Sequence, residues 1–252
     1  MSSYSRKDVS KFLSRNELIE RLAREMPGKS RSTYIMKLQQ MVKDGTLVHV
    51  GRDAYQFAEH SCTYEHAYSE AAMDVAAFLL DQFPLADFRI LEIRQYNAFV
   101  VHLLGRNTIF VSVEKYITES FFYHLQERYP GNVLLHPSVD DYFFYTQPGS
   151  IIVEQLVTEA PHSHQGKWQT CLEKLLVDLV ADKYISSIIS PGDFPWAYEA
   201  ALHTYSVDQR KLFRYARRRN AVEKVRRVMA EMPVFQELGY KEEGSASVEN
   251  RQ

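Results

Sequence analysis

One stretch, residues 30–57, constrains the fold of this chain more than any other. It reads SRSTYIMKLQQMVKDGTLVHVGRDAYQF, with apolar residues at helical spacing in its first half. Ser32 has a side chain suited to cap the start of this helix, and Gly45 is suited to end it in a left-handed conformation. The apolar face that predicts the helix is formed by Ile35, Leu38, Met41 and Val42.

A short hairpin is predicted directly after this helix. Residues 47–50 and 54–57 are apolar enough to form two strands, and Gly51-Arg52-Asp53 between them is a turn with an arginine at its tip. A helix followed by such a hairpin is typical of the reading helix and wing of a winged helix-turn-helix. Asp53 beside Arg52 weakens the wing's attraction to phosphate, because like charges repel.

The preceding residues supply the rest of that predicted domain. Residues 5–13 favour a short helix, and residues 16–26 a second one that Asn16 caps and Pro27-Gly28 stops. In a helix-turn-helix the second helix of the pair enters the major groove, where its first residues meet base edges. The residues predicted to contact DNA are Arg31, Ser32, Thr33, Lys37, Gln40 and Lys43 on the helix and Arg52 on the wing. A protein-docking use of the same domain is the alternative.

Charge is distributed unevenly along the 252 residues. Residues 1–60 contain 11 Lys/Arg against 7 Asp/Glu, and residues 205–252 have the same counts, so each end carries +4. Since the whole chain carries −2, the middle carries −10. The two ends are therefore the parts suited to face phosphate.

Composition bounds the class of protein. An apolar content of 45% and a charged content of 25% are typical of a globular chain. No run of 18 apolar residues predicts a membrane span, and the first residues lack the apolar core of a signal peptide, so a cytoplasmic protein is expected. Cys62 and Cys171 lie far apart, which argues against a disulfide framework or a zinc site. We expect no cofactor and no metal.

Residues 71–232 predict a second domain. Helical patterns at residues 71–83 and 118–129 alternate with strands at residues 89–93, 108–114, 132–136 and 150–157. Residues 98–104 favour a buried strand or a short helix equally. From residue 170 the chain is helical, with one helix expected from residue 208 to about 232, and residues 233–252 are predicted to be a disordered tail. The fold class is thus α/β (α+β): an N-terminal winged helix-turn-helix over residues 1–60, then a mixed-sheet domain with a helical end.

Four sequence blocks carry a resemblance to a known family. The block at residues 45–55, GTLVHVGRDAY, resembles the wing of AbiEi-type antitoxins, although Asp53 stands where that wing has a glycine. Three further blocks are similar to one branch of the family: IFVSVEK at residues 109–115, LEKLLVDL at residues 172–179 and LFRYARRR at residues 212–219. Together they cover about residues 16–219, and their spaced combination is more specific than the wing alone.

This resemblance implies a transcriptional regulator that acts as the antitoxin of a type IV toxin–antitoxin system. It implies that the N-terminal domain binds double-stranded DNA at its own promoter, and that the functional partner is a nucleotidyltransferase-like toxin that need not be bound directly. It implies no catalysis, and it leaves the oligomeric state open. Candidate residues of the antitoxin domain are Glu114, Lys115, Glu173, Asp178, Arg217, Arg218 and Arg219.

Two other interpretations concern charged residues of the second domain. Asp178 and Asp182 lie four residues apart on a predicted helix, and we expect this acidic side to dock against the arginines 217–219 within the domain. Alternatively, Glu114-Lys115 with Asp87 and Glu92 resembles a nuclease cluster, but the spacing (D/E)-x-K that such a site needs is absent. His162 and His164 have metal-ligand chemistry without a third ligand nearby.

Overall fold

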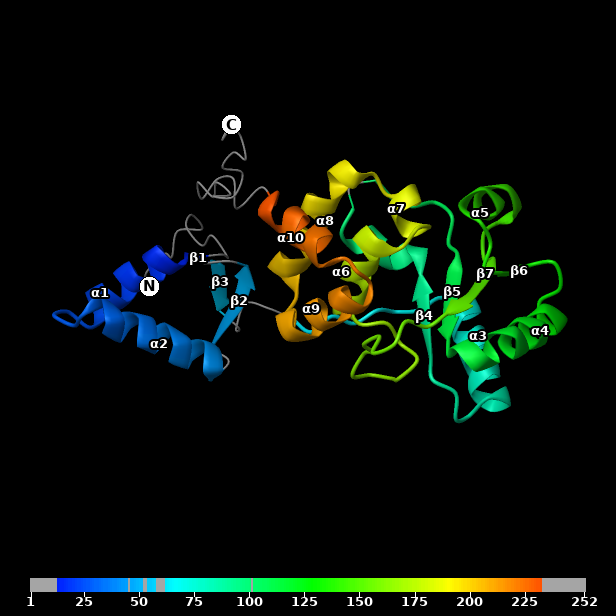
Figure 1. Cartoon of the computed structure of the whole chain (residues 1–252), viewed down its shortest axis with the longest axis horizontal. Helices are drawn as coiled ribbons and strands as arrows, with labels where there is room; N and C mark the ends of the chain where they lie inside the picture. The colour runs from blue at the N-terminus through cyan, green and yellow to red at the C-terminus, as the bar shows by residue number, and fades with distance from the viewer. Residues whose placement is uncertain (1–12, 45, 52–53, 58–61, 101, 233–252) are drawn as a thin grey trace, which may run out of the picture. The chain divides into compact units, whose positions relative to one another are not determined.

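The structure is a computed structural model of the 252-residue chain that describes residues 13–44, 46–51, 54–57, 62–100 and 102–232 (Figure 1). Several predictions therefore lie outside the described residues. These are the helix before Leu13, the stop at Gly45, the turn at Arg52 and Asp53, and the tail at residues 233–252. Among the described residues, unit 1 comprises residues 13–63 and 202–206, and unit 2 comprises residues 64–201 and 207–232.

Unit 1 consists of two helices and a three-stranded antiparallel sheet. Its elements in chain order are β1 (Leu13–Ser14), α1 (Arg15–Glu25), α2 (Arg31–Lys43), β2 (Leu47–Gly51) and β3 (Ala54–Phe57). The hairpin strand β3 lies between its partners, with Leu13 opposite Tyr55 and Leu47 opposite Phe57. The strand that precedes α1 and the hairpin that follows α2 therefore belong to one sheet.

Both helices of unit 1 begin earlier than predicted. Ser14, not Asn16, caps α1: its Oγ accepts from the Glu17 N–H at 3.2 Å, and the Glu17 carboxylate accepts from the Ser14 N–H at 2.7 Å. Ser30, not Ser32, caps α2 by accepting from the Thr33 N–H. In both places the extended backbone of the true cap aims its side chain at N–H groups of the first turn.

The core of unit 1 comes from the apolar stripes of its helices. Buried side chains from α1, α2 and the sheet form one cluster: Leu13, Leu18, Ile19, Leu22, Tyr34, Leu38, Leu47 and Tyr55. Tyr34 replaces Val42 in the predicted stripe of α2, and its hydroxyl donates to the carbonyl of Met26 at 2.9 Å. That bond ties α2 to the end of α1.

Unit 2 is built on a four-stranded mixed sheet of order β4-β5-β7-β6. The strands are β4 (Phe88–Glu92), β5 (Ile109–Val113), β6 (Val133–Leu135) and β7 (Ile151–Gln155). β4 is antiparallel to β5, whereas β5, β7 and β6 are parallel to one another. This sheet, with helices on it and a helical C-terminal part, confirms the mixed α/β class.

Helices cover both faces of this sheet. On one face α3 (Glu70–Gln82) and α4 (Thr118–Arg128) pack against the sheet residues that alternate with Phe110, such as Val111 and Ile90. On the other face Phe110 contacts Tyr142 of α5 (Val139–Tyr145) and Tyr184, which follows α6 (Leu172–Ala181). The remaining helices are α7 (Ile185–Ile188), α8 (Phe194–Thr204), α9 (Gln209–Arg218) and α10 (Val222–Ala230), with short 3-10 turns η2 (Ile93–Ala98), η3 (Lys115–Ile117) and η4 (Pro191–Asp193).

Two predictions for unit 2 are wrong in detail, and one helix was missed. The single helix expected from residue 208 to about 232 is two helices, because Asn220 adopts a φ of 51° that interrupts the helical backbone. The described residues from Phe99 to Leu104 form neither a strand nor a further helix. The seven-residue helix α5 was not predicted at all.

Within the described part of the chain no helix is long and apolar enough to cross a membrane.

Candidate functional site

The exposed face of α2 carries the polar residues predicted to meet DNA. Thr33, Lys37 and Gln40 follow one another at spacings of four and three residues, so they project from the same side of the helix. All three are exposed, as are Met36 and Lys43 beside them. The buried side chains of α2 are Tyr34 and Leu38, which face the core of unit 1. The packing of unit 1 therefore turns this polar face outward.

Arg31 and Ser32 belong to the start of α2 and are engaged within unit 1. The Arg31 guanidinium donates to the Asn16 side-chain carbonyl on α1 at 2.9 Å, and the Ser32 hydroxyl lies 2.7 Å from that of Ser30. These two predicted contacts thus serve the turn between the helices. Farther along the helix, Gln40 donates to the Asp44 carboxylate at 2.7 Å, which holds its amide on the outer face.

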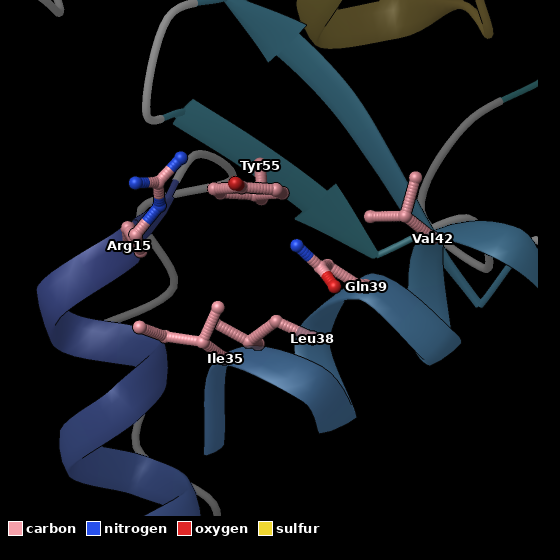
Figure 2. A pocket seen from close by; sticks show the side chains of 6 residues that line it. All are labelled: Arg15, Ile35, Leu38, Gln39, Val42 and Tyr55. Atoms are coloured by element: carbon pink, nitrogen blue, oxygen red, sulfur yellow. The ribbon is translucent and has the colours of Figure 1, made fainter. Parts of the chain in front are cut away.

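A small pocket of about 250 Å³ lies on the opposite side of α2. Figure 2 shows Tyr55 of β3 across from the α2 side chains, with Arg15 of α1 at one end of the pocket. From α2 it is lined by Ile35, Leu38, Gln39 and Val42. Gln39 and Gln40 are neighbours in the sequence that face different surroundings, so they form a natural pair for experiments.

A larger groove, of about 870 Å³, lies in unit 2 at one edge of the sheet. It is bounded by the residues that follow β5, by those that follow β7, by the start of β4 and by α9. The lining includes Asp87, Arg89, Glu114, Lys115, Tyr116, Glu159, His162, His164, Lys211 and Arg214. Of the antitoxin-domain candidates, Glu114 and Lys115 lie here, both exposed. Residues far apart in sequence thus meet in this groove.

Fixed ion pairs hold two of the groove's carboxylates. Arg89 is 4% exposed and donates to the Asp87 carboxylate at 2.5 Å and to the Ala160 carbonyl at 3.2 Å. Glu159 pairs with Arg218 of α9. Lys115 and Arg214 have no carboxylate within ion-pair distance in the described part of the chain. The open cations of the groove therefore outnumber its open carboxylates.

The charged residues of α6 are buried instead of exposed. Glu173, Lys174 and Asp178 are 3–6% exposed, and the Lys174 Nζ donates to the Asp178 carboxylate at 2.5 Å. Glu173 accepts a hydrogen bond from the Asp208 N–H at 2.9 Å, and Asp208 itself caps α9. The candidates Glu173 and Asp178 are thus internal anchors between α6 and α9.

The arginine cluster at the end of α9 divides three ways. Arg219 lies 3.3 Å from the Asp178 carboxylate and donates to that of Asp182 at 3.1 Å, as the docking hypothesis predicts. Arg218 instead pairs with Glu159, and Arg217 is exposed. Docking of the whole cluster on α6 is therefore wrong, because successive residues of one helix point in different directions. Only Arg219 faces α6.

Sequence reasoning missed the partners that complete this buried cluster. Tyr215 donates its hydroxyl to Asp178 at 3.0 Å, and on the sheet Ser112 donates to Glu154 at 2.9 Å. Burial, reinforced by Asp182, raises the pKa of Glu154 to about 7, although Lys174 opposes it. The one sequence signal was the spacing of four between Lys174 and Asp178, which pairs opposite charges on one helix face.

A second buried carboxylate, Glu92, joins β4 to α3. It accepts from the Ser69 N–H at 2.9 Å, from the Ser69 hydroxyl at 2.5 Å and from the Asn107 amide at 2.6 Å. Burial alone raises the pKa of such a group, but these bonds and that of His66 outweigh it and lower the pKa of Glu92 to about 2. Glu92 is thus a structural carboxylate at the start of α3.

The alternative nuclease cluster is only partly assembled, since Asp87, Glu114 and Lys115 line the groove and Glu92 does not. Glu92 is fully buried in its own hydrogen bonds and does not line the groove that holds Asp87 and Glu114. His162 and His164 line that groove, but no group of three or more His, Cys, Asp or Glu residues in the described ranges is arranged to hold a metal ion. The groove therefore offers cations and histidines and lacks a set of metal ligands.

Comparison with known proteins identifies a family and distant structural likenesses. The family of unknown function DUF6577 matches residues 33–233, which is most of the chain. Comparison with curated proteins finds no match. The crystal structure of the RV2827C protein from Mycobacterium tuberculosis is 13% identical, with a TM-score of 0.34, over 90% of this chain and 75% of that one.

Proposed function

The chain belongs to the DUF6577 family, and we propose that it is a DNA-binding transcriptional autoregulator that acts as the antitoxin of a type IV toxin–antitoxin system. The observation that carries the DNA-binding part is the outward polar face of α2, with Thr33, Lys37 and Gln40 on one side of a helix that is packed firmly on its other side. Gln reads adenine and Lys reads guanine in the major groove.

The order of elements in unit 1 supports a winged helix. A strand, two helices joined by a short turn, and a hairpin that pairs with the first strand follow one another as in that domain, with α2 as the reading helix. The shape of unit 1 fixes which side of α2 is free. Because Arg31 contacts Asn16, the proposal narrows to Thr33, Met36, Lys37, Gln40 and Lys43 as the contacts of the described helix.

The antitoxin part of the proposal comes from the resemblance of the four sequence blocks. It gives the chain's own promoter as the DNA partner and a nucleotidyltransferase-like toxin as the functional partner. The cytoplasmic location that we propose with it comes from the composition of the sequence. In this proposal the internally paired charges of unit 2 only hold its fold together. Its outward charges, chiefly Lys115, Arg214 and Arg217, are the ones free to serve antitoxicity.

A gel shift on the duplex upstream of the chain's own gene tests DNA binding. We expect retardation by the full chain at low salt, and a loss of about tenfold in affinity for Gln40→Ala and for Lys37→Ala. Gln39→Ala is the matched control, because Gln39 lines the pocket on the other side of α2. Arg52→Ala tests the wing. Absence of retardation at low salt, or equal losses for Gln39→Ala and Gln40→Ala, contradicts the proposal.

Co-expression tests the antitoxin part separately. A nucleotidyltransferase-like gene beside this one should arrest growth when expressed alone, and the full chain should restore growth. Restoration by the Lys37→Ala variant would show that antitoxicity does not depend on repression. Failure of the wild-type chain to restore growth contradicts the antitoxin assignment and leaves DNA binding untouched.

A further inference from the structure

The groove of unit 2 lies at the carboxyl ends of the neighbouring parallel strands β5 and β7, where the chain continues to opposite faces of the sheet. After β5 the chain passes through Lys115 into α4, on one face of the sheet. After β7 it passes to Ala160, whose carbonyl accepts from Arg89 on the other face. In open α/β sheets, the crevice outside the carboxyl ends of such strands is where ligands bind. The groove at residues 114–117 and 155–161 occupies that position.

The charges of the groove select an anionic ligand. Four cations line it, of which Arg89 pairs with Asp87 and Lys211 lies 4.0 Å from the Glu173 carboxylate. Of its three carboxylates, Asp87 and Glu159 are paired, so Lys115 and Arg214 stand against Glu114 alone. His162 and His164 add two further donors. Lysine and arginine converging from separate segments suit a phosphate group better than a single carboxylate.

Arg89 supplies an independent sign of a missing acceptor. Its side chain is 4% exposed and lines the groove, and its Nε is a buried donor with no acceptor in the described part of the chain. Buried donors are nearly always paired, so an unpaired one calls for an explanation. An anionic group that enters the groove beside Arg89 would be such an acceptor.

One aromatic side chain narrows the ligand further. Tyr116 lines the groove next to Lys115 and is 96% exposed, although an isolated tyrosine ring usually buries most of its surface. An exposed ring beside lysine and arginine is the arrangement that stacks a base while the cations hold its phosphates. The volume of about 870 Å³ lies in the range of small-molecule sites.

We propose that this groove is a nucleotide-binding site, in which Lys115, Lys211 and Arg214 hold the phosphates of a nucleoside phosphate and Tyr116 stacks on its base. The site lies wholly in unit 2 and does not depend on DNA binding by unit 1. A ligand there contacts Arg214 and Lys211 of α9, the helix that is anchored to α6. A bound nucleotide therefore contacts a helix that is bonded directly to the buried cluster of unit 2.

Calorimetric titration of the full chain with ATP, GTP, AMP, pyrophosphate and adenosine tests the site. We expect a nucleoside triphosphate to bind with a Kd below about 100 μM, more tightly than pyrophosphate, and adenosine to bind much more weakly. Lys115→Ala and Arg214→Ala should each weaken triphosphate binding by about tenfold. Arg217→Ala is the matched control, because Arg217 lies on the same helix and does not line the groove.

Tyr116→Ala separates the base from the phosphates. It should weaken triphosphate binding about fivefold or more and leave pyrophosphate binding unchanged, whereas Tyr123→Ala, at another exposed tyrosine, should change neither. Absence of binding by any triphosphate at 1 mM, or equal losses for Arg214→Ala and Arg217→Ala, overturns the site. Equal affinity for pyrophosphate and triphosphates overturns the nucleoside assignment. The nucleoside assignment is also overturned by one result with a single-stranded oligonucleotide. That result is binding to the Lys37→Ala, Gln40→Ala double variant that is tighter than the binding of ATP and is lost when Lys115 is replaced.

Discussion

The helices α2 and α6 carry similar residues and use them in opposite ways. Both have a lysine followed three or four residues later by a polar or acidic residue, as in Lys37 and Gln40 or Lys174 and Asp178. On α2 these side chains are exposed, and on α6 they are 3% exposed and bonded to each other and to α9. The same spacing therefore accompanies an exposed polar face in one unit and a buried scaffold in the other, and burial separates the two cases.

This difference changes how the LEKLLVDL block is understood. Nine of its helix's ten residues are buried, including Glu173, Lys174 and Asp178. A buried charge is costly unless it is paired and hydrogen-bonded, so these side chains depend on their partners in the fold. The charged residues of the block contact Tyr215, Arg219 and Asp208 of the same domain.

The largest effect should come from removing the centre of the buried cluster. Asp178→Ala leaves Lys174 and Arg219 without their shared carboxylate, and breaking a buried pair in this way costs about 3–5 kcal/mol. Urea unfolding followed by circular dichroism should show this loss. Lys37→Ala, with its lysine on the exposed face, is the matched control and should stay within about 0.5 kcal/mol. Equal stability of the two variants would break the comparison between α2 and α6.

A slightly smaller effect should appear in the pH dependence of unit 2. The pKa of Glu92 falls from 4.5 to about 2 on folding, so its ionised form contributes stability above pH 4.5 that is lost as the pH falls toward 2. That contribution is on the order of 3 kcal/mol. Glu92→Gln should therefore lower the free energy of unfolding at pH 7 and flatten its decline below pH 4.5. A variant whose acid limb is as steep as the wild type's would exclude this role.

The smallest effect should come from unit 1. Ser14→Ala removes the cap of α1 and should cost about 1 kcal/mol, since the Glu17 N–H loses its acceptor. Hydrogen exchange should show faster opening of α1 and unchanged protection in the strands of unit 2. Asn16→Ala tests the earlier prediction of the cap and should leave that protection close to the wild type's. If Asn16→Ala lowered the protection of α1 more than Ser14→Ala did, Asn16 would be the cap instead of Ser14.

Periodicity was enough to predict most elements and not enough to predict their ends. The strand at residues 109–113 and the helix at residues 172–181 follow from their apolar patterns, because those patterns match one structure over a whole element. The break at Asn220 depends on one backbone angle, and α5 is too short and too aromatic on all sides to show a period. The cap at Ser14 had a signal, the Ser-x-x-Glu pattern ending at Glu17.

One of the two candidate sites could be predicted from the sequence and the other could not. The outer face of α2 could be predicted, because Lys37 and Gln40 lie on one helix and their spacing sets their direction. The groove of unit 2 could not, since Arg89, Lys115 and Arg214 come from three segments that only the sheet brings together. The sequence grouped Lys115 with Glu114 and Asp87, which do line the groove, but not with Arg89 or Arg214.

A paired measurement of DNA affinity and melting temperature for Lys37→Ala and Arg219→Ala tests the central claim most directly. Lys37→Ala should bind the upstream duplex about tenfold more weakly and melt as the wild type does, because its side chain is exposed on α2. Arg219→Ala should melt several degrees lower and bind DNA with unchanged affinity when folded, because Arg219 pairs with Asp178 and Asp182. The opposite pattern, or losses of both properties in both variants, would contradict the assignment of α2 to DNA and of α6 to the scaffold.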